Sequence, residues 1–366
     1  MSAEAPAHPL AAAWRNFHLQ NPDVRIRDAA ATLGTTEAQL VAAGCGSGST
    51  RLRSDFPALL GTLPALGRVM ALTRNEHAVI EKHGTYAAPS MRGHMGLVLA
   101  DAIDLRLFMN RWHHAFAVTE PGRDGPRRSL QFFDRDGGAV HKVYAVAETN
   151  ADAYDALVER FRDADQGGDL AVTPGKPAPA ETPDAAIDVA GLRAAWAALQ
   201  DTHEFFMLLG KFGVTRTQAL RLAAPEMAWP VARDSHRQVL ASAAASGLPI
   251  MVFVGSPGCI EIHTGPVHKV VESHGWFNVL DPDFNLHLRE SGIAGAWLVR
   301  KPTSDGVVTA LEVYDAAGDA IAQFFGKRKP GSPELPEWTS LAGGLPRAAT
   351  EGGAARGTPG TGPVRV

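Results

Sequence analysis

The sequence contains only two cysteines, Cys45 and Cys259, in 366 residues. A secreted domain held by disulfides would need more cysteines, and a thiolate metal site would usually group them in the sequence. The scarcity of cysteine therefore argues against both classes, and it suits a reducing compartment.

Long hydrophobic runs are absent as well. No stretch approaches the roughly 20 apolar residues that a membrane-spanning helix needs, and the apolar run at 248–254 has only the length of a strand. The N-terminus carries Glu4 where a signal peptide would carry positive charge, and no apolar segment follows it. These features predict a cytoplasmic protein without membrane insertion.

An excess of positive charge is also missing, because 35 Lys and Arg residues face 39 Asp and Glu residues, for a net charge of −4. Such a balance provides no global basic field for non-specific nucleic-acid binding. The chain has no Cys-x-x-Cys-His, His-Glu-x-x-His, Gly-x-Ser-x-Gly or P-loop motif. Covalent haem attachment, zinc-peptidase, serine-hydrolase and P-loop chemistry are therefore not predicted.

What the chain does have is a copy of itself. Residues 99–144 align with residues 280–325 at a constant offset of 181 and without a gap, and Gly84 falls on Gly265 at the same offset. The copies agree in apolar pattern and turn residues, which a shared fold preserves. We therefore expect two similar halves with room for a ligand between them. Positions where only one copy carries a chemically special group are candidates for function.

Each copy begins with helices and continues with strands. Helices are expected at 11–20, 24–33 and 37–43, and again at 192–199, 203–212 and 216–224, with Thr36 and Thr215 as caps. Strands are expected at 95–100, 115–119, 129–134 and 140–145, and at 276–280, 295–300, 308–315 and 320–325. Consecutive strands without helices between them indicate antiparallel sheet. The predicted fold class is therefore α+β, a tandem repeat in which each half has a helical N-terminal part and a large antiparallel β-sheet, the two halves packed together.

Composition sets the expected boundaries. Residues 1–165 form the N-terminal repeat and residues 189–342 the C-terminal repeat. The segment 166–188 between them is rich in Pro and Gly and is expected to be a linker. Residues 343–366 are again rich in Gly and Pro, and we expect a disordered tail.

His203 is the first group that breaks the repeat. It lies seven residues after Trp196, whereas the position seven residues after Trp14 is Asn21, followed by Pro22. Its neighbours include Phe205 and Phe206, and an imidazole beside aromatic surface suits an axial ligand of haem iron. A histidine in a first helical turn without any role is the alternative.

Arg216 begins the next expected helix, where the other copy has Glu37. A cation at a helix start opposes the helix dipole, which suggests a reason such as a carboxylate ligand. A surface cation is the alternative. On an expected strand, Arg106 aligns with His287 and alternates with Leu105 and Leu107, so it faces away from them.

Further cations and one amide lie at strand ends in the half that carries His203. Lys301 aligns with Glu120, Gln323 aligns with Lys142, and Arg328 closes the run from Gln323. As a set they could receive two propionates, whereas each taken alone also fits a solvated surface charge. His263 and His268 flank Gly265-Pro266 and are expected at the surface.

With these residues the chain resembles the bacterial cytoplasmic haem-utilisation family of haemin-degrading factors or haem-transport proteins (the HemS, HmuS, ChuS and PhuS type). The resemblance runs from about Trp14 to Trp338. It is carried by Trp196, by the segments 201–205 and 213–220, by 258–267, by 104–106, and by Gln323, Gly326 and Arg328. The motifs are strong together and weak individually.

The resemblance implies a haem b site, non-covalent, in a cleft between the N- and C-terminal parts. His203 would be the proximal iron ligand, and Arg106 would lie on the distal side with Phe108 against the porphyrin. Arg216, Lys301, Gln323 and Arg328 would contact propionates or line the cleft. The family often has tyrosine where this chain has Phe325, so a hydroxyl donor near the propionates is lost.

Three functions follow as hypotheses. The first is a carrier that receives haem from an inner-membrane importer and passes it to a haem oxygenase or another acceptor. The second is an enzyme that opens the ring with an electron donor and O₂ or peroxide, in which Arg106 would act on the distal side. The oligomeric state, monomer or dimer, is left open.

The third hypothesis is a helix-turn-helix DNA-binding regulator, suggested by the pattern of residues 27–43. Its would-be recognition helix, 37–43, contains no Lys or Arg. A tri-helical packing unit is therefore favoured over DNA binding.

Overall fold

The computed structural model describes residues 8–122, 125–175, 180–329 and 331–348. In the part of the chain before the 166–188 segment, the helices are α1 (Pro9–Gln20), α2 (Ile26–Thr32), α3 (Glu37–Ala43), α4 (Phe56–Leu60) and α5 (Ala151–Phe161). The strands there are β1 (Ser49–Leu52), β2 (Gly67–Arg74), β3 (Ala78–Thr85), β4 (Ser90–Arg92), β5 (Met95–Leu99), β6 (Asp104–Phe108), β7 (His114–Glu120), β8 (Arg127–Phe133) and β9 (Ala139–Thr149).

The part after that segment repeats the order. Its helices are α6 (Val189–Ala197), α7 (Glu204–Phe212), α8 (Arg216–Leu222), α9 (Ser235–Ser246) and α10 (Pro336–Gly343). Its strands are β10 (Ala228–Val231), β11 (Ile250–Gly255), β12 (Cys259–Gly265), β13 (Val270–Ser273), β14 (Trp276–Leu280), β15 (Phe284–Arg289), β16 (Gly295–Thr303), β17 (Gly306–Tyr314) and β18 (Ala320–Gly326). Short 3₁₀ turns lie at Leu63–Leu66, Met109–Arg111, Asp184–Ala186 and Glu290–Gly292. The α+β tandem arrangement expected from the sequence is therefore present.

The two sheets exchange strands between the halves. The first sheet has the order β1-β7-β8-β9-β2-β3-β15-β14-β13, and the second has the order β10-β16-β17-β18-β11-β12-β6-β5-β4. Each nine-stranded sheet thus takes six strands from one half and three from the other. The joints are antiparallel pairings of β3 with β15 and of β12 with β6. The repeat alone did not predict this exchange.

The inner faces of the two sheets pack together and form most of the core. One cluster joins Ile80 and Leu286 of the first sheet to Val252 and Phe324 of the second, and helices α9 and α10 complete it. A second cluster joins Leu105 of β6 to Phe132 of β8, together with α4 and α5. Burial of these side chains at roughly 25 cal/mol per Å² is the main stabilising term.

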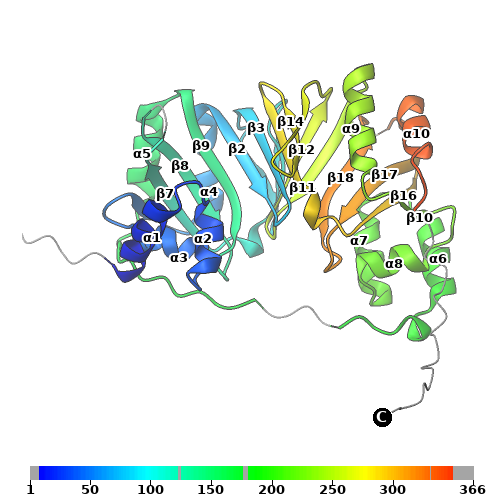
Figure 1. The fold of residues 1–366 in the computed structure, drawn as a ribbon, viewed down its shortest axis with the longest axis horizontal. Coiled ribbons are helices and arrows are strands. Elements are labelled where there is room, and N and C mark those ends of the chain that lie inside the picture. Colours follow the sequence, from blue (N-terminus) through cyan, green and yellow to red (C-terminus); the bar gives the residue numbers. More distant parts are fainter. Residues whose placement is uncertain (1–7, 123–124, 176–179, 330, 349–366) are drawn as a thin grey trace, which may run out of the picture.

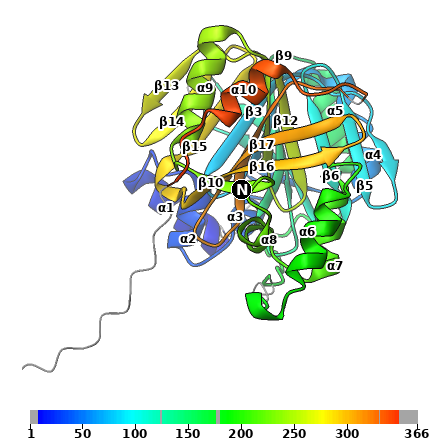
Figure 2. The ribbon, with the colours of Figure 1, turned by 90° about the vertical axis from the view of Figure 1, so that its right-hand side faces the viewer.

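The outer face of each sheet carries one of the two N-terminal helix groups. Trp196, Phe205 and Leu220 from α6–α8 pack on Val299 and Tyr314 of the second sheet. Figure 1 shows α1–α3 and α6–α8 as two groups at opposite ends of the molecule, both in the lower part of the view. Figure 2, turned by 90°, shows α9 and α10 on the other side of the second sheet.

Helix α3 packs on the first sheet through Ala38, Val41 and Ala42. Six of its seven residues are buried, all but Gln39. A helix buried in this way offers no free face to a DNA groove, and this favours the packing unit over the helix-turn-helix interpretation.

The segment expected to be disordered from residue 343 is ordered at its beginning. Leu345 is buried, Ala232 N donates to Pro346 O at 2.9 Å, and Val231 bridges to Arg347. The rest of the expected tail, 349–366, lies outside the described residues.

Candidate functional site

The candidate residues from the sheet share one face. In the second sheet, Glu312 pairs with Gln323, which pairs with Phe253, while Ala310 pairs with Phe325. On the two strands that follow β11 in the sheet, Ile260 of β12 pairs with Arg106 of β6. Because paired residues in neighbouring strands point to the same side, these side chains lie on the outer face. Phe108 shares this face because it lies two residues after Arg106 on β6. Lys301 shares it because it lies two residues after Val299, which pairs with Ala310.

This outer face is apolar between its charged groups. Met251, Phe253, Ile260 and Phe325 are only partly buried. The rings of Phe253 and Phe325 meet edge to face, with centroids 4.9 Å apart. Incompletely covered aromatic and aliphatic side chains that adjoin one another are suited to a flat apolar ligand.

His203 stands at the N-terminus of α7, and its side chain is 87% exposed. Its Nδ1 lies 2.6 Å from Asp201 Oδ1, and its backbone N–H donates to the same oxygen at 2.8 Å. The hydrogen bonds from His203, together with its charge and that of Arg328, lower the pKa of the Asp201 carboxyl. The carboxylate thereby favours the proton on Nδ1 and leaves Nε2 as the basic nitrogen, the arrangement typical of a metal-binding histidine.

The loop before α7 is held at several points. Glu204 Oε2 accepts from the backbone N–H of Gln200 at 2.9 Å. Gln200 O accepts from Ser304 N at 2.9 Å, and Trp196 Nε1 donates to Arg300 O at 2.9 Å. The position of His203 is therefore tied to β16 and to the turn that follows it.

The helix presents apolar side chains beside the imidazole. Phe206 is 80% exposed and Met207 is 66% exposed, at positions three and four residues after His203. Residues at this spacing share one helix face. The exposed imidazole thus lies at the edge of an exposed apolar surface.

Arg216 and Lys301 both bind Glu312, which is fully buried on β17. Arg216 Nη2 and Nε lie 2.6 and 2.8 Å from the two carboxylate oxygens, and Lys301 Nζ lies 3.0 Å from Oε1. The sequence suggested a carboxylate ligand for Arg216, whereas in the structure its guanidinium is paired with Glu312 of the chain itself. Tyr314 also donates to Glu312.

The charges in this group adjust one another's pKa. Burial, with help from Arg216, lowers the pKa of Lys301 to about 8 although Glu312 opposes the shift. Burial would raise the pKa of Glu312, but Arg216 and Lys301 outweigh it and hold that pKa well below its usual value. Two cations against one carboxylate leave a net positive charge on the same outer face, beside its apolar part.

The other candidates lie around this group. Arg106 is 28% exposed and binds Asp104 on its own strand. Arg328 is 19% exposed, and its guanidinium lies 3.3 Å from Asp305. Gln323 makes no side-chain hydrogen bond within the described ranges, and its backbone pairs with Glu312 and Phe253.

Two other histidines are less accessible. His263, expected at the surface, is 5% exposed and stacks on Phe284 at 3.7 Å between ring centroids. Burial lowers its pKa to about 3. His287 is on the first sheet, with Nδ1 2.7 Å from Asn278 Oδ1.

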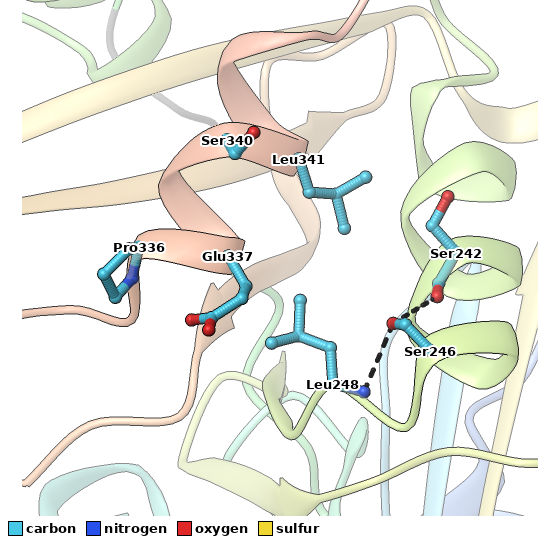
Figure 3. Close-up of a pocket in the computed structure, with 7 residues that line it drawn as sticks. All are labelled: Ser242, Ser246, Leu248, Pro336, Glu337, Ser340 and Leu341. Carbon is cyan, nitrogen blue, oxygen red and sulfur yellow. Dashed lines mark hydrogen bonds between the residues drawn. The ribbon is translucent and has the colours of Figure 1, made fainter.

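Two surface pockets within the described part of the chain lie away from these residues. A cavity of about 560 Å³ between α9 and α10 is lined by Ser242, Leu248, Pro336 and Leu341, among others (Figure 3). Another, of about 370 Å³, adjoins residues 46–50 and Tyr154. Neither contains a candidate haem residue.

Sequence reasoning missed Asp201 and Glu312 as contributors. Asp201 was visible only as a carboxylate two positions before the candidate ligand. Glu312 was visible as another break in the repeat, because the aligned residue is Gln131.

No helix in the described ranges is long and apolar enough to span a bilayer.

Comparison with known proteins identifies relatives over nearly the whole chain. The family model of the haemin-degrading HemS.ChuX domain matches twice, at residues 34–161 and 213–345. The hemin transport protein HmuS of Yersinia pestis is 41% identical over 327 residues, which cover 87% of this chain and 92% of the relative. HemS of Yersinia enterocolitica, also a hemin transport protein, is 42% identical, with the same coverages.

Solved structures of similar proteins match nearly the whole chain as well. Holo-PhuS, a heme-binding protein from Pseudomonas aeruginosa, superposes with a TM-score of 0.91 and 48% identity, covering 94% of this chain and 100% of that one. The heme-degrading enzyme ChuS of Escherichia coli O157:H7 superposes with a TM-score of 0.87 and 38% identity, covering 93% and 100%.

Proposed function

The chain belongs to the haemin-degrading HemS.ChuX family, and on this premise we propose that it binds haem b non-covalently on the outer face of the second sheet. His203 is the axial iron ligand. The observation that carries the proposal is the state of this imidazole, exposed, bonded through Nδ1 to Asp201, and adjoining exposed Phe206 and Met207. A flat apolar macrocycle with a metal that accepts imidazole fits these neighbours.

The remaining candidates take roles that follow from their places. Arg106 lies across the apolar face as the distal residue, with Phe108 against the porphyrin. Arg328 and Gln323 receive propionates. Arg216 and Lys301 line the site and supply the positive charge that favours propionates, while Glu312 holds them in place. Phe325 adds apolar contact and donates no hydrogen bond.

Haem transport is the function that this site supports best. A ligand histidine on an exposed helix end can take up and release its cargo without a large opening of the fold. We propose that haem arrives from an inner-membrane importer and leaves to a haem oxygenase or another acceptor, in the cytoplasm. Among the relatives, HmuS and HemS are named hemin transport proteins.

Haem degradation is the second candidate, because ChuS is described as a heme-degrading enzyme and as a heme oxygenase. Bound haem would supply the iron at which ring opening occurs. Arg106, a partly exposed cation on the same face, would then orient the oxidant. Its bond to Asp104 holds the guanidinium in place for this task.

A haemin titration followed by absorbance tests the ligand. Wild type should show a saturable Soret shift near one equivalent. His203→Ala should lose it, and Asp201→Asn should weaken affinity by about 10- to 100-fold because the second-shell carboxylate is gone. His18→Ala, an exposed histidine of α1, is the matched control and should titrate like wild type.

Titration of His203→Ala identical to wild type would assign the iron to another residue. To separate carrier from enzyme, ascorbate is added to the haem complex with catalase present. Degradation is favoured if the Soret band still disappears when catalase is present and disappears more slowly in Arg106→Ala. A Soret band that remains stable favours transport.

A further inference from the structure

The first half carries the same outer face, with a different lining. Across the first sheet, Arg74 pairs with Val79, which pairs with His287, which pairs with Asn278. At the offset of 181, this row corresponds to Gly255, Ile260, Arg106 and Leu97 of the second sheet. Phe108 corresponds to Arg289. The lining has thus become more polar, with arginines in place of Gly255 and Phe108 and an asparagine in place of Leu97.

Helix α2 adds to this change. Where α7 exposes Phe206 and Met207, α2 begins with Arg25 as its cap and carries Arg27 in its first turn. Arg27 Nη1 donates to the carbonyl of Asn75, the residue after Arg74, at 3.2 Å. This bond places the start of α2 beside the end of β2.

Four arginines gather here, Arg25, Arg27, Arg74 and Arg289, and act on one another. Burial, with the nearby charge of Arg74, lowers the pKa of Arg27 to about 10. Burial also lowers the pKa of Arg74, and the charges of Arg289 and Arg25 contribute. Like charges held together at a partly buried place are costly unless an anion accompanies them.

The carboxylates nearby do not fully meet this need. Glu37 is bound to Lys142, and Glu76 is bound to Arg27. Glu81, whose charge acts on His287, accepts a hydrogen bond from Asn285. Asp28 is exposed. Within the described ranges the Arg74 guanidinium makes no hydrogen bond or ion pair, and its Nε is buried without a partner. The Arg289 guanidinium lies over the ring of Trp276, 4.9 Å from its centroid.

We propose that this basic face, formed by Arg25, Arg27, Arg74 and Arg289 with His287, binds a small multivalent oxyanion. Its chemistry is that of a phosphate ester or a di- or tricarboxylate, with Arg74 as the central ligand. Guanidinium groups pair with such oxyanions through parallel N–H donors. A flat apolar ligand does not suit this face, because Arg289 and Asn278 stand where the second sheet has Phe108 and Leu97, and Asn21-Pro22 replaces the ligand histidine.

Calorimetric titration of the full-length protein tests the proposal, with pyrophosphate and citrate as separate probes at low ionic strength. Wild type should bind at least one of them saturably, and the tighter probe identifies the phosphate or the carboxylate class. Arg74→Gln should weaken binding by about tenfold or more. Arg68→Gln is the matched control, on the same face of β2 but already paired with Asp283, and should bind like wild type.

Haemin titration and the melting temperature check that each variant is folded, and Arg289→Gln replaces Arg74→Gln if the latter does not fold. The proposal is overturned if neither pyrophosphate nor citrate binds saturably. It is also overturned if Arg74→Gln, or the Arg289→Gln variant that replaces it, binds the anion as tightly as wild type does. A haemin titration of normal stoichiometry beside a failed anion titration would refute this inference and leave the proposed haem site untouched.

Discussion

Among single residues, Glu312 holds together Arg216 and Lys301 on the outer face of the second sheet. It is 0% exposed and binds Arg216, Lys301 and Tyr314. A buried carboxylate with three partners is costly to lose, because its cations then remain without compensation. The group therefore works as a unit.

Glu312→Gln should lower the free energy of unfolding by about 3–5 kcal/mol at pH 7. It should also weaken haem binding, because Arg216 and Lys301 are no longer held. Urea unfolding measures the first effect and the Soret titration the second. Glu181→Gln, which removes an exposed partner of Arg221, should change stability by less than about 1 kcal/mol. Equal effects of the two variants would contradict this account.

Glu261 is a second buried carboxylate, between the sheets, and neither of its oxygens has a hydrogen-bond partner in the described ranges. It lies near His141, Cys259, Thr73, Tyr86 and Lys82. Burial raises its pKa to about 8. The aligned residue in the other copy is Ile80, so this polar cluster is also specific to one half.

Stability should therefore fall as the pH rises toward 8. Between the unfolded pKa of 4.5 and the folded pKa of about 8, the folded protein keeps the Glu261 proton and the unfolded chain has lost it. Each pH unit in this window then costs about 1.4 kcal/mol. Burial lowers the pKa values of His141 and His263 to about 3, so below pH ~6.5 they oppose this trend by favouring the unfolded state as the pH falls.

Between about pH 6.5 and 8 two other groups also change protonation, because burial raises the pKa of Asp134 to about 7 and lowers that of Lys301 to about 8. The contribution of Glu261 is therefore the difference in slope between wild type and a variant that lacks its carboxyl. Urea unfolding of Glu261→Gln should show a flatter pH dependence there than wild type. Glu81→Gln on β3 of the first sheet, whose carboxylate accepts from Asn285, should keep the wild-type slope. A slope unchanged in Glu261→Gln would mean that the residue is ionised in the folded protein.

At the scale of elements, α7 determines where His203, the proposed iron ligand, stands. The helix ends at Gly213, whose φ of 62° lies in the left-handed region, and this conformation favours glycine. Gly210, one turn earlier, is inside the helix, and a Cβ added there would meet nothing within 4 Å.

Two alanine substitutions in α7 should therefore have opposite signs. Gly213→Ala should destabilise by about 1 kcal/mol because alanine resists the left-handed conformation. Gly210→Ala should stabilise by about 0.5–1 kcal/mol because it removes backbone freedom from the unfolded chain. Thermal unfolding of both variants measures the difference, and effects of the same sign would contradict the assignment of this helix end.

Most helices and strands were predictable because their signals are local. Thr36 and Thr215 cap α3 and α8 as expected, and β14, at Trp276–Leu280, matches the expected bounds. The pairing of β6 with β12 was not predictable, because alternation in a strand shows which faces are buried but not which edge it joins. The binding of Lys301 to Glu312 was equally hidden, since it depends on register across two strands.

For the whole molecule, strand exchange joins the halves more firmly than the linker does. Three strands of each half complete the other half's sheet. The linker contacts both helical groups, through Gln39 to Leu170 O at 3.3 Å and Gln218 to Thr182 O at 2.6 Å. Its residues at 166–175 and 180–188 are mostly exposed, so the segment can be cut without disturbing the sheets.

Cleavage within 166–188, at an inserted protease site, should therefore leave one particle. The two fragments should co-elute in gel filtration and bind haemin with unchanged stoichiometry. They should separate only in denaturant. Separation under native conditions would show that the sheet joints are weaker than the pairing of β3 with β15 and of β6 with β12 implies.

The exchange of strands also bears on how such a chain could arise. In a single-copy ancestor, the strands that now cross over would have had to complete the sheet of a second subunit, as a twofold homodimer. Both ligand faces would then have been identical, and every mutation would have altered both. Fusion into one gene removes that constraint, so that one face could acquire the proposed haem site while its twin acquired the proposed anion site.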